Sequence, residues 1–244
     1  MIDGGRYETK RIKRIPVYRF FRVKSTFDYA KSKKDKGKDL FVVATTQSQG
    51  RGRNGRVFSS TRGGLYLTWL HFPQNLSAQN AFCLIRQAAV AVCKTLESYG
   101  VSPTIKWPND ILVNGKKIGG ILTENTLKGG LIASSLIGIG VNIHNRLEEE
   151  LRPIATTLQE VISKKIPVRE VEKTLRKNLY LPYAKEAYFA RLSYLGEVEI
   201  VEGEKRYPAF AEGVDEEGLL MVVVDGVRQK KSAAEISLRQ RMDI

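Results

Sequence analysis

The sequence has few of the residues that metal sites and nucleophilic active sites use. Among its 244 residues it contains two cysteines, Cys83 and Cys93, and two histidines, His71 and His144. The cysteines lie ten residues apart on a predicted helix, a separation of about 15 Å that no disulfide can span. So few ligands and bases exclude a zinc site and a Ser-His-Asp or Cys-His arrangement. We therefore expect any nucleophile to come from the substrates.

Long apolar segments are also missing. No apolar run approaches the roughly 18 residues that a membrane-spanning helix needs, and the N-terminus lacks the apolar core of a signal peptide. Both thiols are expected to be reduced, so we predict a cytoplasmic protein outside the membrane. A hydrophobic content of 42% and a charged content of 27% are typical of a globular protein. The chain is long enough for one large core and a small appended domain.

Positive charge is in excess. The net charge is +14, and residues 1–40 contain 13 Lys or Arg against 5 Asp or Glu. Such a segment can indicate nucleic-acid binding. However, the aromatic and glycine pattern of an RNA-binding sheet is missing, and residues 1–17 are too few for a helix-turn-helix. We predict no sequence-specific DNA binding, and expect either nonspecific contact with polyanions or steering of an acidic partner protein.

The most informative motif is Gly50-Arg51-Gly52-Arg53-Asn54-Gly55-Arg56. Glycines let the backbone reach positive φ and expose N–H groups, and arginine side chains match carboxylate or phosphate oxygens two at a time. A basic solvated loop is the alternative, but three neighbouring arginines need a compensating partner. The motif predicts a loop that cradles an anion.

Two nucleotide-binding motifs share part of this pattern and fail on context. A Rossmann fingerprint requires a helix that opens on the glycines and an acidic residue about 20 positions later. Residues 57–64 have no helical period, and no acidic residue lies between Gly55 and Glu97. A P-loop fails as well, because no Gly-Lys-Ser/Thr opens a helix here.

Two further segments stand out. Lys106-Trp107-Pro108-Asn109-Asp110 follows a strand-like run, and Pro108 ends strand pairing because it has no N–H. Lys106 is therefore predicted at a strand end beside a polar turn. In Ile137-Gly138-Ile139-Gly140-Val141-Asn142 the two glycines share one face of a strand. They mark either a bulge or a close approach of a ligand to the backbone.

The pattern of elements indicates an α+β fold with a mixed, mostly antiparallel sheet and helices on one face. Helices are predicted over residues 77–99, 27–34 and from 168 to an interruption at Pro182, with Ser77 as the N-cap of the first. Residues 144–157 are predicted to be either a mobile lid or a plain surface loop.

The C-terminal part has a different pattern. Short strands are predicted over residues 197–202, 206–214, 219–224 and 227–233, with glycine turns between them. We therefore divide the chain into residues 1–192, a catalytic domain, and residues 193–244, a small β-barrel domain.

Together these segments resemble the biotin protein ligase family. The matching pieces are Gly50–Arg56, Lys106–Asp110, Lys117-Ile118-Gly119-Gly120-Ile121-Leu122-Thr123-Glu124, Ile137–Asn142 and Glu235-Ile236-Ser237-Leu238-Arg239. They follow in the family's order and spacing. One position departs: the family usually has Ser-Thr-Asn near its start, whereas this chain has Ser25-Thr26-Phe27.

The resemblance implies a fold shared with class II aminoacyl-tRNA synthetases and lipoate ligases, followed by an SH3-type barrel. It implies an enzyme that activates biotin with ATP and Mg²⁺ as biotinyl-5′-AMP and transfers it to a lysine of a biotin carboxyl carrier protein. The chain resembles the form of the family that has no N-terminal DNA-binding domain. A homodimer is expected. The alternatives are a lipoate ligase or transferase on the same fold and a non-enzymatic nucleic-acid-binding protein.

Site residues follow from the same resemblance. Lys106 and Arg53 are expected to be catalytic. The residues expected to bind biotin are Ser25, Thr26, Gln47, Gly50, Arg51, Gly52, Arg53, Lys106, Gly120, Gly138 and Gly140. Those expected to bind ATP are Arg51, Arg53, Phe58, Lys106, Asn109 and Asn142. Other roles are open: an exposed loop residue for Gln47, a turn amide for Asn142, and a core side chain for Phe58. Asp110 and Glu124 are the candidate Mg²⁺ ligands.

Overall fold

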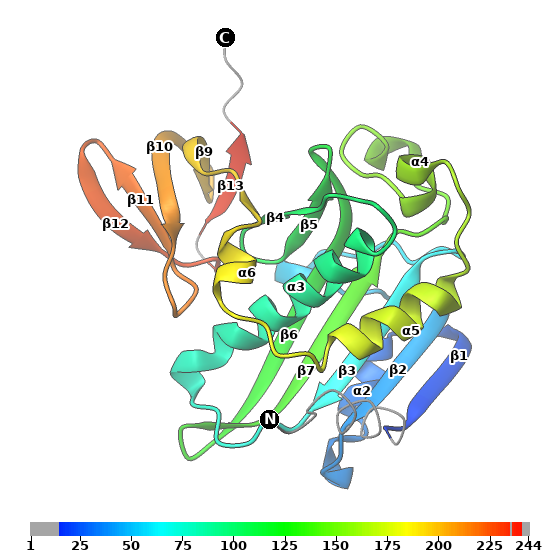
Figure 1. Ribbon diagram of the computed structural model, residues 1–244. Coiled ribbons are helices and arrows are strands. Elements are labelled where there is room, and N and C mark those ends of the chain that lie inside the picture. The colour runs from blue at the N-terminus through cyan, green and yellow to red at the C-terminus, as the bar shows by residue number, and fades with distance from the viewer. Residues whose placement is uncertain (1–14, 235, 241–244) are drawn as a thin grey trace, which may run out of the picture.

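The computed structural model describes residues 15–234 and 236–240. Residues 1–14, which hold 5 of the 13 Lys or Arg of the basic N-terminal segment, and Glu235 of the C-terminal motif lie outside that part. The molecule is built around an eight-stranded sheet with a second, five-stranded sheet beside it (Figure 1). The predicted fold class, α+β with a mostly antiparallel sheet and a small C-terminal β unit, is confirmed.

The large sheet has the order β1-β2-β3-β7-β6-β5-β4-β8. Only the two end pairs, β1 with β2 and β4 with β8, are parallel. The strands are β1 (Val17–Val23), β2 (Leu40–Gln47), β3 (Leu65–His71), β4 (Thr104–Lys106), β5 (Asp110–Val113), β6 (Lys116–Lys128), β7 (Leu131–Val141) and β8 (Leu192–Ser193).

Helices cover both faces of this sheet. The long helices α3 (Phe82–Glu97) and α5 (Val168–Asn178) lie on one face, as predicted. The short helix α2 (Thr26–Lys31) packs on the other face, so the prediction that the helices share one face is wrong for α2. Alternate strand residues point to opposite faces. Trp69 packs toward α3 and α5, and Leu70 packs in the cluster around α2.

The remaining helices are short. They are η1 (Lys34–Lys36), η2 (Arg53–Gly55), η3 (Ala78–Ala81), η4 (Glu149–Leu151), α4 (Leu158–Ile162) and α6 (Glu186–Phe189). The predicted N-cap of the long helix is wrong: α3 begins at Phe82, after the separate 3₁₀ turn η3, and the Ser77 side chain makes no capping bond. The Ser77 backbone pairs with Leu131 instead, so a tertiary contact overrides the capping preference.

The C-terminal unit is a five-stranded sheet of order β12-β11-β10-β9-β13. Its strands are β9 (Gly196–Glu202), β10 (Lys205–Val214), β11 (Leu220–Val224), β12 (Val227–Lys231) and β13 (Ser237–Gln240). The first four lie where the sequence predicted them and form a meander. The boundary at residues 192 and 193 stays a prediction; β8, which ends at Ser193, still belongs to the large sheet.

The two sheets share an apolar core. The cluster under α3 continues into Val198, Ile200 and Leu220 of the C-terminal unit. A polar contact crosses the same junction, since the Trp107 indole N–H donates to the Gly218 carbonyl at 3.0 Å. In the part of the chain that the structure describes, no helix has the length and apolar character needed to cross a membrane.

Candidate functional site

The cradle, Gly50–Arg56, is a compact loop between β2 and β3. The Gly52 N–H donates to the Arg56 carbonyl at 2.7 Å, and η2 forms its tip. A Cβ at Gly50 would lie 2.3 Å from the Phe58 carbonyl oxygen, so no larger residue fits there without a shift. The glycines therefore allow the tight path that the motif predicted.

Two of the three arginines of the cradle, Arg51 and Arg53, have acceptors within the protein. Arg51 forms an ion pair of 2.7 Å with Asp28 at the start of α2. Arg53 donates to the Asn109 side-chain oxygen at 3.0 Å and to the backbone carbonyl of Ala233 in the C-terminal unit. The sequence showed that the arginines need partners but did not identify these ones.

Lys106 ends β4 and lies opposite Asp110 in the register of β4 and β5. The Asp110 carboxylate is paired with Lys117 at 2.6 Å rather than with Lys106. The Lys106 ammonium lies 5.0 Å from the ring centroid of Tyr194. Lys106 therefore sits at a strand end beside a polar turn, as predicted, with an aromatic neighbour that the sequence did not indicate.

Burial lowers the pKa of Lys106. The Asp110 carboxylate opposes this effect, and the cations Lys117, Arg239 and Arg56 add to it. These groups come from β6, β13 and the cradle, so several positive charges converge on one place. Such a convergence is electrostatically unfavourable and is suited to an anionic ligand.

Asn109 links the cradle to the large sheet. It is buried, and its amide N–H donates to the Ile121 carbonyl of β6 while its oxygen accepts from Arg53. The structure thus brings two of the three sequence motifs into direct contact. Arg53 and Asn109 are 56 residues apart in the chain.

A network of hydrogen bonds joins α2 to the end of β2. The Gln47 side-chain oxygen accepts from the Thr26 backbone N–H at 2.7 Å and from the Thr26 hydroxyl at 2.9 Å. The Gln47 amide N–H donates to Ser60 at 2.9 Å, and Thr68 donates to Thr26. Ser25 caps α2 by accepting from the Asp28 N–H. Both acceptor positions of the Gln47 oxygen and one of its two N–H groups are used, so the second N–H is left for a ligand.

The glycines of β7 face α2 and are covered by aromatic rings. A Cβ at Gly138 would lie 3.1 Å from the Phe27 ring, and a Cβ at Gly140 would lie 2.5 Å from the Phe58 ring. Phe27 is buried, at 4% exposure. The space above the glycines is therefore filled by side chains of the chain itself, so a ligand there would require at least the Phe58 ring to move.

Gly120 faces the charged pair beside Lys106. It lies opposite Asp110 on β5 and opposite Gly140 on β7. A Cβ there would lie 3.3 Å from the Lys117 side chain and 3.4 Å from Asp110. Gly120 thus connects the two glycines of β7 with the surroundings of Lys106.

Asn142 is held inside a turn. Its side-chain N–H donates to the Thr156 carbonyl at 3.1 Å, and its side-chain oxygen accepts from the Asn145 side chain at 3.1 Å. The segment 144–157 also lies against the residues after the cradle, where Ser59 donates to Glu148 at 2.8 Å. The turn-amide role of Asn142 is therefore present, and its contact with ATP stays a prediction, as does the lid.

The two candidate Mg²⁺ ligands are neither together nor free. Asp110 pairs with Lys117, and Glu124 pairs with Lys31 at 2.7 Å. Asp110 lies opposite Gly120 of β6. Glu124 follows Gly120 by four residues on the same strand, which separates the two positions by about 13 Å. Residues 15–234 and 236–240 contain no cluster of three or more metal-ligating side chains. The two carboxylates do not fit one shared ion site.

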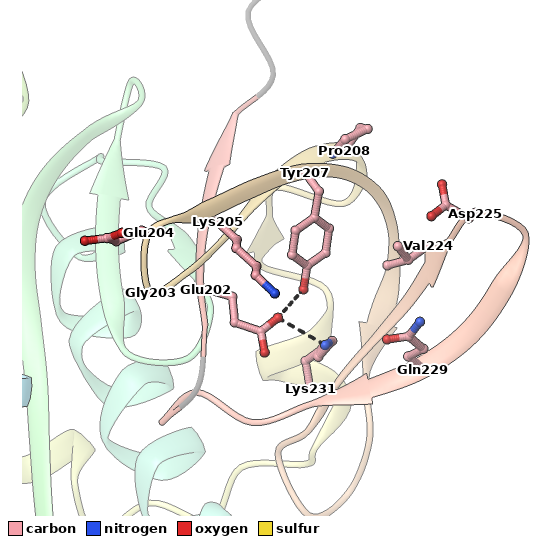
Figure 2. A pocket seen from close by; sticks show the side chains of 10 residues that line it. All are labelled: Glu202, Gly203, Glu204, Lys205, Tyr207, Pro208, Val224, Asp225, Gln229 and Lys231. Atoms are coloured by element: carbon pink, nitrogen blue, oxygen red, sulfur yellow. Dashed lines mark hydrogen bonds and ion pairs between the residues drawn. The ribbon is translucent and has the colours of Figure 1, made fainter.

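A hollow of the described surface lies elsewhere. It has a volume of about 780 Å³ and lies between the hairpins of the C-terminal unit (Figure 2). Glu202 accepts from Tyr207 and forms an ion pair with Lys231 at 3.3 Å, as the dashed lines show. None of the predicted site residues lines it, so the chemistry indicated by the motifs belongs to the cradle.

Comparisons with known proteins show which family has this arrangement of motifs. Residues 19–142 match the profile of the biotin/lipoate A/B protein ligase family. The bifunctional ligase/repressor BirA of Bacillus subtilis is 42% identical over 130 residues, which cover 51% of this chain and 40% of that protein. The biotin–[acetyl-CoA-carboxylase] ligase of Paracoccus denitrificans is 29% identical over 219 residues, covering 80% of this chain and 89% of that protein.

The fold agrees with a solved structure. The biotin protein ligase of Aquifex aeolicus in complex with biotin and ATP superposes with a TM-score of 0.75 and 26% identity, covering 93% of this chain and 99% of that one. This chain spans less than half the length of the Bacillus relative. The matched residues 19–142 contain the cradle, Lys106 and both β7 glycines and make up just over half of the chain. The chain therefore belongs to the biotin/lipoate A/B protein ligase family.

Proposed function

We propose that this protein is a biotin–protein ligase, which activates biotin with ATP and transfers it to a lysine of a biotin carboxyl carrier protein. The observation that carries the proposal is the hydrogen bond between Arg53 of the cradle and Asn109 of the Lys106 segment. It joins an anion-binding loop to a half-buried lysine at one site. The names of the Paracoccus and Aquifex relatives favour biotin over lipoate as the acid.

In the first step, a carboxylate oxygen of biotin attacks the α-phosphorus of ATP, and the bond to the leaving pyrophosphate breaks. The product is biotinyl-5′-AMP. Negative charge builds on the phosphorus oxygens, and fixed cations lower the barrier most where that charge develops. We assign this role to Lys106 and Arg53, while Arg51 and the cradle at Gly50 and Gly52 wrap the anions.

In the second step, the amine of an acceptor lysine attacks the carbonyl carbon of the adenylate, and AMP leaves with the phosphate oxygen. No side chain of this protein has to act as a nucleophile. The site has to hold the two reacting groups together and exclude water.

The biotin ring is assigned to the α2 face of the sheet. Ser25, Thr26 and the remaining N–H of Gln47 supply polar contacts at one end, and Gly120, Gly138 and Gly140 lie beneath it. Phe58 moves from Gly140 toward the adenine as the ring enters. Asn109 and Asn142 are assigned to the nucleotide side. Phe27 supplies an apolar wall where the family usually has Asn.

The test is to incubate the purified protein with ATP and biotin, or with ATP and lipoate, and to identify the adenylate by mass spectrometry. We expect biotinyl-AMP and pyrophosphate with biotin only, and a mass gain of one biotin on an added carrier domain. Lys106→Ala should slow single-turnover adenylation far more than it weakens biotin binding, because the charge matters most in the transition state.

Lys116→Ala is the matched control, since Lys116 is exposed and bonds only the Arg152 carbonyl among the described residues. It should behave like the parent. Equal losses of affinity and rate in Lys106→Ala would make Lys106 a binding residue, and lipoyl-AMP without biotinyl-AMP would contradict the proposed substrate.

The homodimer stays a prediction. Among the described strands, the edge strand β1 pairs on one side only, with β2, and Phe21 on it is 73% exposed. Both features are compatible with a contact between two copies. Light scattering on the parent and on Phe21→Ser would test it: a dimer that becomes monomeric supports this edge, and a monomeric parent contradicts the prediction. The cytoplasmic location also stays a prediction.

A further inference from the structure

The ammonium of Lys106 is held by an aromatic ring rather than by an acid. Its Nζ lies 5.0 Å from the ring centroid of Tyr194. Across residues 15–234 and 236–240, no hydrogen bond or ion pair to Lys106 Nζ is formed, and the nearest acid in register, Asp110, is taken by Lys117 at 2.6 Å. A lysine side chain has many rotamers of similar energy, so the ring contact matters for where the charge is placed.

Tyr194 lies between β8 of the large sheet and β9 of the C-terminal sheet. Ser193, the last residue of β8, lies opposite Lys106 in the parallel pairing of β8 with β4. The next residue, Tyr194, has φ 62°, a left-handed conformation that a bulky side chain rarely adopts. Gly196 follows with φ 84° and begins β9. Unfavourable backbone conformations of this kind concentrate at functional sites.

Charged groups from several elements surround Lys106. Asp110 of β5 favours the charged amine, whereas Lys117 of β6, Arg239 of β13 and Arg56 of the cradle disfavour it, and burial disfavours it most. The negative face of an aromatic ring favours a cation placed over it. The ring therefore offsets part of the cost of keeping a positive charge among other cations.

We propose that Tyr194 is the positioning residue of Lys106: its ring holds the ammonium at the end of β4 and stabilises its charge there. The proposal rests on the proposed function, because it assigns Lys106 to the adenylation step. Tyr194 itself touches no reacting atom. It also links the two structural units, because the backbone that places the ring is the segment between β8 and β9.

The test uses three substitutions in the full chain. Tyr194→Phe keeps the ring face, and Tyr194→Leu removes it. Tyr194→Gly also removes the ring but suits the left-handed backbone, so a loss in this variant cannot come from strain at φ 62°. Tyr207→Leu is the matched control, because it removes another tyrosine under a lysine, Lys231 at 5.8 Å, in the C-terminal unit.

The first readout is the charge of Lys106 itself. The rate at which an amine-selective reagent modifies Lys106 is followed against pH by peptide mass spectrometry. We expect the midpoint to fall by about 0.4 to 1.5 pH units in Tyr194→Leu and Tyr194→Gly, the range of a cation–π contact. Tyr194→Phe and Tyr207→Leu should keep the parent midpoint.

The second readout is adenylation. In Tyr194→Leu and Tyr194→Gly the single-turnover rate should fall about 2- to 30-fold while the affinity for biotin stays near that of the parent. Tyr194→Phe should restore the rate. An unchanged midpoint or rate in both ring-deleting variants overturns the proposal, and so does a Phe variant as impaired as the Leu variant.

The two proposals fail separately. If the parent makes no biotinyl-AMP, the proposed function is wrong, and the Lys106 midpoint alone still decides whether Tyr194 sets the charge of its neighbour. If the parent makes biotinyl-AMP but the midpoint does not respond to Tyr194, the proposed function stands and this inference falls.

Discussion

The Phe58 ring stands so close to Gly140 that a Cβ added at Gly140 would lie 2.5 Å from two of its atoms. Real Cβ contacts do not occur at that distance, so one of the two groups would have to move. The pair joins the loop after the cradle to β7, and it occupies space that the resemblance assigned to a ligand.

Gly140→Ala should therefore destabilise the fold through overpacking, by about 1–3 kcal/mol in urea unfolding. Phe58→Ala should remove most of that effect, with a coupling energy of at least about 0.5 kcal/mol in the double-mutant cycle. Gly138→Ala is the control, because its Cβ would meet Phe27 at 3.1 Å and should not respond to Phe58→Ala. Additive effects of Gly140→Ala and Phe58→Ala would contradict the contact.

Gln47→Leu should reduce both stability and biotin affinity. It leaves the Thr26 N–H without its acceptor, at about 1–3 kcal/mol if that group stays dry, and it removes the N–H assigned to biotin. We expect biotin affinity to fall about 2- to 12-fold, by calorimetry. Ser60→Ala removes the acceptor of the other Gln47 N–H and the hydroxyl that donates to the Phe58 carbonyl, but it leaves both Thr26 contacts of Gln47 in place and should cost less stability. A Gln47→Leu protein as stable as the parent would refute the network.

Arg53→Gly should still form some adenylate but hold it poorly. The guanidinium and its contacts to Asn109 and Ala233 are lost together. A lost charge-assisted hydrogen bond of about 1.5–3 kcal/mol corresponds to roughly 10- to 150-fold faster release, and the free adenylate would then biotinylate lysines of an unrelated protein. The measurement is a blot for biotin on that protein.

The control for Arg53→Gly is Arg62→Gly, which removes an exposed arginine outside the cradle. It should leave the unrelated protein unlabelled. If Arg53→Gly also leaves it unlabelled and adenylate dissociates no faster, Arg53 does not retain the intermediate.

Asp39 should make the fold sensitive to acid. Burial raises its pKa, but hydrogen bonds from His71 at 2.8 Å, from the Phe72 N–H at 2.9 Å and from Tyr180 at 2.8 Å, with the charge of His71, hold the pKa below its usual range. A pKa that is lower in the folded state stabilises the fold above about pH 4, and this contribution is lost as the pH falls through the folded value.

Asp39→Asn should consequently lower the unfolding free energy at pH 7 and flatten its decline between pH 5 and pH 3. Urea unfolding across that range measures both effects. Asp35→Asn changes an exposed carboxylate on η1 and should follow the parent curve. If the unfolding free energy of Asp39→Asn fell between pH 5 and pH 3 as steeply as that of the parent, the Asp39 carboxylate would not be the cause of the acid sensitivity.

Local patterns were sufficient for most of the fold. Alternation and glycine turns predicted the four strands β9 to β12, and the strand end at Lys106 followed from Pro108. Local patterns did not predict that Ser77 would pair with Leu131 rather than cap α3. Competition between a cap and a distant strand is decided by the tertiary structure, which no short window of sequence contains.

The candidate site was predicted as residue types but not as partners. The cradle indicated an anion, yet the acceptors Asp28 and Ala233 lie far from it in sequence and belong to no motif. Tyr194 carried no signal either, because a single tyrosine just before a predicted strand is ordinary. The sequence showed that the two glycines of β7 share one face of a strand, which has no side chains at these positions. The rings of Phe27 and Phe58 that cover this face could be found only in three dimensions.

The contact between Arg53 and Ala233 has a consequence for how the protein is made. Ala233 is synthesised 180 residues after Arg53. On the ribosome, the cradle therefore emerges long before the carbonyl that holds its arginine, and a nascent chain that already has its large sheet still lacks this contact. A chain that ended early would keep the arginine and the lysine but not this acceptor, so the candidate site is completed late in synthesis.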